Sequence, residues 1–438
     1  MFPVSQANII TEQAYRKAVL HSNRVRKERT AQKLDYFHDE QGPYIIEQLR
    51  RIYTKSADKV QPVSVNIVKK IINLKSTVYL QDATRFIQGT DQNKQIYAEI
   101  ETTANLPVTM KLANKYTSLL GNVLLRPVWR DGRMELDVLT GNVLDVVTGD
   151  SPQDIRAVIV EHFSQNGRAD EITYSAWTPE EVRTLDYAGN VIATELNPYG
   201  ILPFVPIWNT PAQGDFWLSG AEDLILIQDA VNRSLSDLCR TLGFQAFSVA
   251  VMRGVSMKEH QGVTIDPGAV LALENKDSGF DFKSPNAPIG EVLDTVDRLI
   301  KWAALTNGLS ASSVNTEIVE ESGVSKIVGN AELEEIRRDQ IANFASVEDQ
   351  LFQMFRTVWN VHNPQRKISE GATLRVDFYD PRPASSLSER VQEIQALAEL
   401  GLFSPIDFLM EQNPDLDRDM AKAKLLQIRD DLREFPIN

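Results

Sequence analysis

Along the first 120 residues, apolar positions recur at the three- and four-residue intervals of helices that bury one face. Residues 63–80 show this most clearly, and weaker versions follow Tyr44 and cover residues 108–120. A charged, polar stretch over residues 11–34 also has the character of a helix. Four helices are therefore expected at the start of the chain.

The pattern then changes to short runs rich in β-branched and aromatic residues, such as VLLRPVW and AVIVEHFS. Asp-Gly, Thr-Gly and Asn-Gly pairs separate these runs, and such pairs are typical of turns between antiparallel strands. An antiparallel β region is predicted over residues 122–209.

Two amphipathic helices follow, separated by a segment of short strand-like runs and loops at residues 246–286. Ser219–Glu222 forms a capping box in sequence, in which each side chain satisfies a free amide at the helix start. Behind it, apolar residues from Leu224 to Leu242 recur every three or four positions. Pro288 suits the first turn of the second helix, and Asn307-Gly308 is a stop signal for it.

The next stretch, SASSVNTEIVEESGVSKIVGN at residues 310–330, is rich in serine, valine and glycine. A loop of this length is usually functional or disordered. Asn330 is a good N-cap, and the glutamates after it favour the positive end of a helix dipole. A very long helix is therefore predicted over residues 331–363, with its apolar spacing broken only at Gln340.

The chain closes with a strand, TLRVDFYDP, and short helices opened by capping boxes at Ser386–Glu389 and Ser404–Asp407. Helices and antiparallel strands in this order place the chain in the α+β class. No repeat of fixed period is present.

Composition is that of a folded protein, with 438 residues, 42% hydrophobic and 24% charged. No apolar run approaches the roughly 18 residues of a membrane span, and the first residues lack the apolar core and cleavage site of a signal peptide. Cys239 is the one cysteine. It leaves no internal disulfide, fits a reducing cytosol, and is expected to be a small buried side chain.

The formal net charge of −14 argues against wrapping of nucleic acid by the whole chain, because phosphate binding requires a basic face. It does not exclude a protein that lets DNA pass without gripping it. The main basic run is most simply a solvated helix face. It comprises Arg24, Arg26, Lys27, Arg29 and Lys33.

Motifs for catalysis or metal binding are weak. Phosphate-binding glycine loops, dinucleotide fingerprints and paired Cys-x-x-Cys motifs are missing from the sequence. His38-Asp39-Glu40 cannot converge on one ion from a regular element. Asp415–Asp419 lacks the later glycine and glutamate of a calcium loop and favours an acidic helix start. Ser322 and Lys326 lie four apart without the further partners of a nucleophilic serine. No catalytic residue, metal or cofactor is predicted.

The order of helix, β insertion, helix, loop and very long helix describes a stalk with a tip, whose apolar stripe can be buried against neighbouring copies in a ring. The stretch ILPFVPIWNTPAQGDFWLSGAEDLILIQDAVNRSLSDLCRTLGFQAFSVAVMRG contains a strand, Pro203–Asn209, and the helix motifs Asp229–Asn232 and Ser236-Asp237. In these residues the chain resembles the portal proteins of tailed bacteriophages, especially the branch typical of long-tailed phages of Gram-positive hosts. Residues 305–350 are similar to the loop and long helix of that family.

The resemblance implies a portal-like fold and assigns a part of it to each segment. These are a helical and β wing (1–218), stem helix 1 (219–245), a small α/β clip (246–286), stem helix 2 (287–307), a tunnel loop (308–330), a long wing helix with a strand (331–383) and a small helical crown (384–438).

Candidate site residues follow from the same assignment. In the tunnel loop they are Ser312, Ser313, Asn315, Glu317, Val319, Ser322 and Lys326. Arg298 and Lys301 on the second stem helix are candidates for facing the channel, with inter-subunit salt bridges or solvation as the alternative. In the clip, candidates for partner binding are Arg253, Lys258, Asp277 and Lys283.

The function implied is that of a ring, usually of twelve copies, at one capsid vertex, through which double-stranded DNA is packaged, retained and ejected. Implied partners are the terminase, the head-tail adaptor, and the major capsid and scaffolding proteins, with no membrane. The ring would be assembled in the host cytoplasm and reside in the virion. A monomeric adaptor or minor capsid protein, and a packaging-associated enzyme, remain alternatives.

Overall fold

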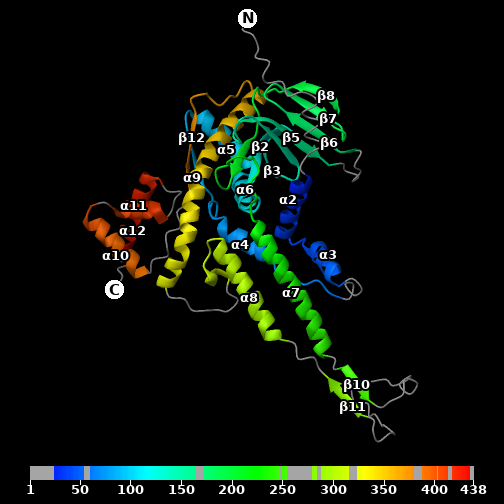
Figure 1. Cartoon of the computed structure of the whole chain (residues 1–438). Coiled ribbons are helices and arrows are strands. Elements are labelled where there is room, and N and C mark those ends of the chain that lie inside the picture. The colour runs from blue at the N-terminus through cyan, green and yellow to red at the C-terminus, as the bar shows by residue number, and fades with distance from the viewer. Residues whose placement is uncertain are drawn as a thin grey trace. The chain divides into compact units, whose positions relative to one another are not determined.

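The computed structural model describes residues 24–53, 60–163, 171–246, 249–253, 279–283, 288–314, 323–378, 387–401, 403–412 and 417–434. The chain divides into two compact units, Met1–Tyr379 and Asp380–Asn438. Figure 1 labels helices and strands of both units and colours them in chain order.

The helices of the first unit are α2 (Arg24–Phe37), α3 (Gly42–Ile52), α4 (Ile67–Lys75), α5 (Asp91–Thr103), α6 (Leu106–Leu120), α7 (Glu222–Ala246), α8 (Ile289–Thr306), the 3₁₀ turn η4 (Ala311–Val314) and α9 (Gly323–His362). Its strands are β1 (Thr84–Gln88), β2 (Asn122–Arg130), β3 (Arg133–Leu139), β4 (Leu144–Thr148), β5 (Ile155–His162), β6 (Thr173–Trp177), β7 (Glu181–Leu185), β8 (Val191–Leu196), β9 (Val205–Trp208), β10 (Val249–Arg253), β11 (Gly279–Lys283) and β12 (Thr373–Asp377).

The antiparallel β region predicted over residues 122–209 is confirmed as two sheets. One has the order β3-β2-β9 and the other the order β4-β5-β6-β7-β8. Asp131-Gly132 forms the turn between β2 and β3, and both residues have positive φ, which a tight hairpin turn of this kind requires. The turn residues in the local sequence therefore predicted the place of this hairpin correctly.

The N-terminal helical region contains two elements that were not predicted, the strand β1 and the helix α5, which lie between α4 and α6. β1 pairs antiparallel with β12, so that Thr84 lies opposite Asp377. The strand TLRVDFYDP was expected, but its partner lies almost 290 residues earlier in the chain, and local periodicity carries no information on such a pairing. The helix predicted over 63–80 is shorter, because the Asn66 side chain accepts a hydrogen bond from the Lys69 amide and so begins α4 at Ile67.

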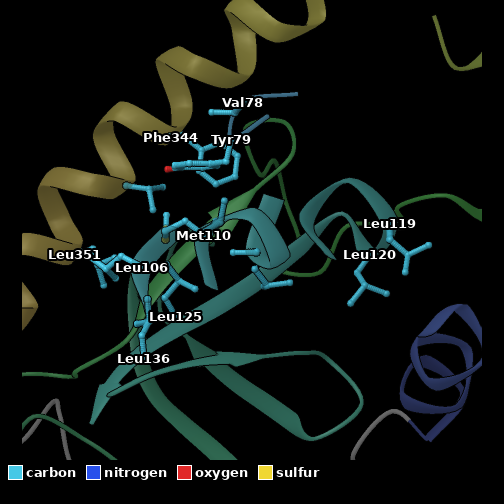
Figure 2. Close-up of a cluster of buried hydrophobic side chains, with 14 of the residues drawn as sticks. Val78, Tyr79, Leu106, Met110, Leu119, Leu120, Leu125, Leu136, Phe344 and Leu351 are labelled. Atoms are coloured by element: carbon cyan, nitrogen blue, oxygen red, sulfur yellow. The ribbon is translucent and has the colours of Figure 1, made fainter. Parts of the chain in front are cut away.

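The main core lies where α9 crosses α6 and the β2–β3 hairpin. Figure 2 shows side chains from all of these elements meeting there. Tyr79 and Phe344 are in edge-to-face contact, with ring centroids 5.4 Å apart. Gln340, which breaks the apolar spacing of the long helix, is nonetheless buried, and the side-chain amide of Asn114 donates to it at 3.5 Å.

The start of α7 corrects the predicted capping box. The helix begins at Glu222, so this glutamate is too early to act as the third helical residue. The Ser219 carbonyl accepts a hydrogen bond from the Lys33 ammonium, and the Glu222 carboxylate pairs with the same lysine at 2.7 Å. Gly220 has a φ of +56° and directs the chain past the end of α6, where the Ala221 amide donates to the Leu119 carbonyl at 2.9 Å. A buried lysine therefore replaces the local cap.

Substitution of Gly220 by alanine is expected to lower the free energy of unfolding by about 3 kcal/mol, from backbone strain plus overpacking. An added Cβ would lie 2.4 Å from the Leu120 carbonyl carbon and 2.5 Å from the Leu119 oxygen. Gly132→Ala is the matched control, because Gly132 also has positive φ but no atom within 4 Å of an added Cβ. Urea unfolding would measure both variants, and equal losses would show that the close approach at Gly220 contributes nothing.

The start of the long helix is a second correction. α9 has 40 residues and begins at Gly323, eight positions before the predicted start. Asn330 therefore lies inside the helix instead of capping it, and so does Gly329 before it. A glycine in a helix interior costs only about 1 kcal/mol relative to alanine, which a long packed helix can absorb.

The second unit contains three helices, α10 (Leu387–Glu399), α11 (Pro405–Gln412) and α12 (Arg418–Glu434). The capping box at Ser404–Asp407 is confirmed, because the Asp407 carboxylate accepts from the Ser404 amide at 2.9 Å and the Ser404 hydroxyl accepts from the Asp407 amide at 3.3 Å. The Ser404 hydroxyl also donates to the Asp407 carboxylate, and this bond, together with that from the Ser404 amide, lowers the pKa of Asp407. Asp417 accepts from the Met420 amide at 2.8 Å, as predicted for an acidic helix start. Ser386 lies outside the described residues.

Candidate functional site: the paired helices, the loop and the long helix

α7 and α8 pack against each other, and their contact is anchored where α7 begins and α8 ends. The Asp223 carboxylate accepts hydrogen bonds from the Asn307 side-chain amide at 3.3 Å and the Thr306 hydroxyl at 3.5 Å. The Lys75 ammonium donates to the Asn307 oxygen at 2.9 Å. Burial lowers the pKa of Lys75, and the charge of Asp223 opposes this shift. One end of the helix pair is therefore held to α4 by a partly buried polar cluster.

The loop that follows α8 is closely packed where it begins. Gly308 has a φ of +69°, and a Cβ there would lie 2.5 Å from the Cδ1 atom of Ile336 on α9. Leu309 is buried, and η4 follows it. The Ser310 hydroxyl lies 2.9 Å from the hydroxyls of both Ser312 and Ser313. The first residues of the predicted tunnel loop are therefore a packed turn against the long helix.

The other predicted loop residues divide into two groups. Lys326 lies in the first turns of α9, so its assignment to a loop was wrong in secondary structure. The remaining four lie outside the described residues. They are Asn315, Glu317, Val319 and Ser322.

The helix motifs that carried the family resemblance form a buried polar seam on α7. Gln228, Asn232 and Ser236 lie four residues apart on one helix face and are fully buried. Gln228 Oε1 accepts from the Ile67 amide at 2.8 Å, and its Nε2 donates to the Val65 carbonyl at 2.8 Å. The seam thus supplies hydrogen bonds to the backbone at the start of α4.

The same seam extends to the segments around α3. The Asn232 side-chain amide donates to Gln41 Oε1 at 2.8 Å, and the Ser236 hydroxyl accepts from the Val63 amide at 3.0 Å. Beside the seam, Asp237 accepts from the Tyr53 hydroxyl at 2.6 Å. Asp229 likewise accepts from the Tyr36 hydroxyl. All of these side chains serve to dock α7 on the N-terminal helices.

Asn232→Ala is expected to lower the free energy of unfolding by about 1–3 kcal/mol, because it leaves buried polar groups of Gln228 and Gln41 without a partner. The exposed neighbour Arg233→Ala is the control and should change stability by less than about 0.5 kcal/mol. Thermal or urea unfolding of the two variants would measure the difference. A neutral Asn232→Ala would indicate that the seam is not needed for docking.

The basic run of the sequence is neither a DNA-binding patch nor a fully solvated face. Arg26 donates to the carbonyls of Gly141 and Leu144 and pairs with Asp145 at 2.7 Å. Its guanidinium lies 4.0 Å from the centroid of a Trp217 ring. Burial lowers the pKa of Arg26, against the opposing charge and hydrogen bond of Asp145. Together with Lys27, which pairs with Asp145 and Glu161, these contacts dock α2 on the β region. Arg29 remains exposed.

A buried ionic network holds the long helix to the other side of the core. Arg85 on β1 has no exposed side-chain surface and pairs with Glu348 on α9 at 2.7 Å and with Glu101 on α5 at 3.0 Å. The Tyr79 hydroxyl donates to Glu348 at 2.8 Å. Burial acts to lower the pKa of Arg85, but the hydrogen bonds and charge of Glu348 outweigh it and raise that pKa. Burial, reinforced by the charge of Glu348, also raises the pKa of Tyr79.

The two channel-facing candidates both lie on α8. Arg298 is exposed, and Lys301 pairs with Asp297 on the next turn at 2.6 Å. Three large apolar side chains on the helix pair are also exposed. Leu226 on α7 is 70% exposed, and Trp302 and Leu305 on α8 are 58% and 54% exposed. The described part of the chain therefore leaves apolar side chains of both helices uncovered.

Two of the four clip candidates, Arg253 and Lys283, lie on a two-stranded ribbon. β10 and β11 pair antiparallel, with Val249 opposite Lys283 and Arg253 opposite Gly279. Arg253 and Lys283 therefore lie at opposite ends of the ribbon. Lys258 and Asp277 lie outside the described residues.

The described residues include no group of three or more His, Cys, Asp or Glu side chains that could hold a metal ion. A search of the described helices likewise finds none with the length and apolar character needed to cross a membrane. Cys239, expected to be buried, is exposed. Leu242 on the next turn is also 44% exposed, so this part of α7 extends past the elements that cover its beginning.

The elements described above define a structural subunit whose distinguishing parts are a helix pair, a loop and a long helix. A family model described as "Phage portal protein, SPP1 Gp6-like" matches residues 25–434. The chain belongs to this family of phage portal proteins, and its role is that of a portal connector.

Similar solved structures come from gene transfer agent (GTA) particles. A chain from the neck of an empty GTA particle computed with C6 symmetry has a TM-score of 0.51 and 10% identity, covering 78% of this chain and 88% of that chain. A chain from the virion of the native GTA particle has a TM-score of 0.49 and 10% identity, covering 77% of this chain and 87% of that chain. A chain from the neck of the native GTA particle computed with C12 symmetry has a TM-score of 0.45 and 10% identity, covering 77% of this chain and 86% of that chain. The first of these indicates a shared fold. Comparison with curated proteins gives no sequence match.

Proposed function

We propose that the chain assembles into a ring of about twelve copies that forms the DNA channel at one vertex of a phage-like capsid. The observation that carries this proposal is the apolar surface of Leu226, Trp302 and Leu305 on the helix pair of a portal-family chain. Burial of three large apolar side chains against the next copy would gain about 1.5–3 kcal/mol for each. Repetition of one such heterologous contact closes a ring when its rotation permits.

In this proposal α7 and α8 are the stem, β10 and β11 belong to the clip, and the residues between α8 and α9 line the tunnel. The second unit is a small crown. The ring admits double-stranded DNA, receives the terminase during packaging and the head-tail adaptor afterwards, and is surrounded by capsid and scaffolding proteins. It assembles in the host cytoplasm, remains in the virion and has no catalytic activity of its own.

The charge of the subunit supports a channel that binds the phosphate backbone of DNA only weakly. Each neutralised phosphate adds affinity, and therefore resistance to movement. The net charge of −14 and the pairing of Lys301 with Asp297 leave few cations to bind the phosphate backbone of DNA. Arg298, which is exposed on the same helix, is proposed as a sparse positive ring in the channel.

Imaging of the purified chain by negative stain, together with light scattering, tests this proposal. Rings with a central hole and a mass of about twelve subunits are the expected result. A stable monomer at high concentration would exclude the ring and favour the adaptor or minor capsid protein. Nuclease or ATPase turnover by the purified chain would instead favour a packaging enzyme.

A further inference from the structure

The outer strand of the five-stranded sheet is an open edge. β8 is the last strand in the order β4-β5-β6-β7-β8, and among the described strands it pairs with β7 alone (Figure 1). All five residues from Ile192 to Leu196 are exposed. Ile192 is 62% exposed and Leu196 is 85% exposed. Within the regularly paired part of the strand, Thr194 and Leu196 lie on one face because side chains alternate.

The direction of the free backbone groups follows from one hydrogen bond. The Asn197 amide donates to the Glu180 carbonyl at 3.0 Å, so it points toward β7. Successive residues of a strand direct their backbone groups to opposite sides, so the amides of Thr194 and Leu196 point away from β7. The register irregularity of this pair lies at the turn end, where Val191 lies opposite Leu185 and Ala193 opposite Thr184, so that Ile192 has no partner on β7. The outward amides therefore belong to the regularly paired part of β8.

Beyond the irregularity at Ile192, this edge lacks the protection usual in soluble proteins. Exposed edges are commonly protected by lysine, proline or a bulge that turns the strand away. Ala193 to Leu196 contain neither lysine nor proline, and Glu195 is the one charge of β8. An edge with free amides and carbonyls accepts an extended strand, because a helix has no free backbone groups to pair with it.

The charge of the hairpin indicates the chemistry of that strand. Residues 180–196 contain four carboxylates, on Glu180, Glu181, Asp186 and Glu195, against one arginine, Arg183. Arg183 itself pairs with Glu181 at 2.5 Å. Pairing of β8 with β8 of a second copy would bring two acidic hairpins together. Such a contact is also isologous, so it would join two copies and could not continue around a ring.

We propose that β8 is a strand-addition site for an extended segment of another protein, in which apolar residues alternate with lysine or arginine. The added strand pairs with the outward backbone groups of Thr194 and Leu196, covers the side chain of Leu196, and places its cations near the hairpin carboxylates. This surface is separate from the helix pair, so the proposal does not depend on ring formation.

Fluorescence anisotropy of a labelled peptide with the full chain tests the proposal. The probe is Lys-Val-Lys-Val-Lys-Val-Lys, and its control has proline in place of the central valine. Saturable binding of the probe is expected, with the control about tenfold weaker, as the loss of a backbone hydrogen bond predicts. Equal binding of the two peptides would show a purely ionic contact and overturn strand addition.

A pair of protein variants adds specificity. Thr194→Pro removes the outward amide while leaving the bonds to β7, and it should weaken probe binding about tenfold. Thr194→Val keeps the amide and should bind like the wild type. Binding of the probe to Thr194→Pro with unchanged affinity would place it elsewhere and refute the proposal.

Hydrogen exchange of the wild-type chain gives a measurement that requires no variant. The amides of Thr194 and Leu196 should exchange rapidly in the purified protein and slow on addition of the probe. Protection of both amides in the assembled protein without the probe would mean that a neighbouring copy already occupies the edge. No slowing on probe binding would equally contradict the proposal.

Discussion

Glu348→Ala is expected to lower the free energy of unfolding of the first unit by about 3–5 kcal/mol, which is the cost of breaking a buried ion pair from one side. The glutamate is 1% exposed on its side chain and pairs with Arg85, which is fully buried. Its removal leaves the guanidinium with Glu101 as its remaining carboxylate, and leaves the Tyr79 hydroxyl without its acceptor. Such a loss is a large fraction of the total stability of a typical domain, which is about 5–15 kcal/mol.

Asp349→Ala provides a control on the same helix, since Asp349 is exposed. Urea unfolding followed by circular dichroism would measure both variants, and Asp349→Ala should stay within about 0.5 kcal/mol of the wild type. The variant Glu348→Gln should recover part of the loss, because it keeps a hydrogen-bond acceptor for Tyr79. Equal stability of the Glu348 and Asp349 variants would show that the network does not hold α9 in place.

Trp302→Asp is expected to weaken ring assembly strongly while leaving the fold intact. The tryptophan is 58% exposed in the single chain, so its loss removes little of the subunit core. A buried tryptophan at the centre of an interface commonly contributes 2 kcal/mol or more, and the concentration needed for assembly should rise by more than about 30-fold. Sedimentation velocity over a range of concentrations would show the shift from rings to monomers.

Trp302→Phe should retain rings, because it keeps most of the apolar area on the same face of α8. Circular dichroism of Trp302→Asp should match the wild type, which separates failed assembly from failed folding. Rings formed by Trp302→Asp at wild-type concentrations would show that this face is not the contact between copies, even if the wild-type chain forms a ring.

Local sequence predicted the elements whose cause is local. Helical spacing located the helices around residues 45–52 and 108–120, and turn pairs located the antiparallel region, including the hairpin at Asp131-Gly132. The capping box at Ser404–Asp407 was also predictable, because both of its partners lie within one turn of helix. The capping box predicted at Ser219 was wrong because the partner of the Ser219 carbonyl is not local. It is Lys33, which is 186 residues away in the sequence.

For the candidate site, the sequence indicated the motifs but not their roles. Asn232 and Ser236 carried the resemblance to portal proteins, and the structure shows them buried in a seam against Gln41 and Val63. Arg298 and Lys301 were predicted to face the channel from the second stem helix, and both lie on α8. Lys301 pairs with Asp297 four residues earlier on this helix, a spacing already present in the sequence.

By itself, the sequence determined the mixed helical and antiparallel character, the helix pair and long helix, and the resemblance to portal proteins, because periodicity, turns and family motifs lie in short stretches. The tertiary structure alone decided the pairing of β1 with β12, the use of the basic run to dock α2, the network around Glu348, and the exposure of Trp302 and β8. Each of these depends on which distant segments meet. Burial of charge and exposure of apolar surface are properties of that meeting, and local sequence does not encode them.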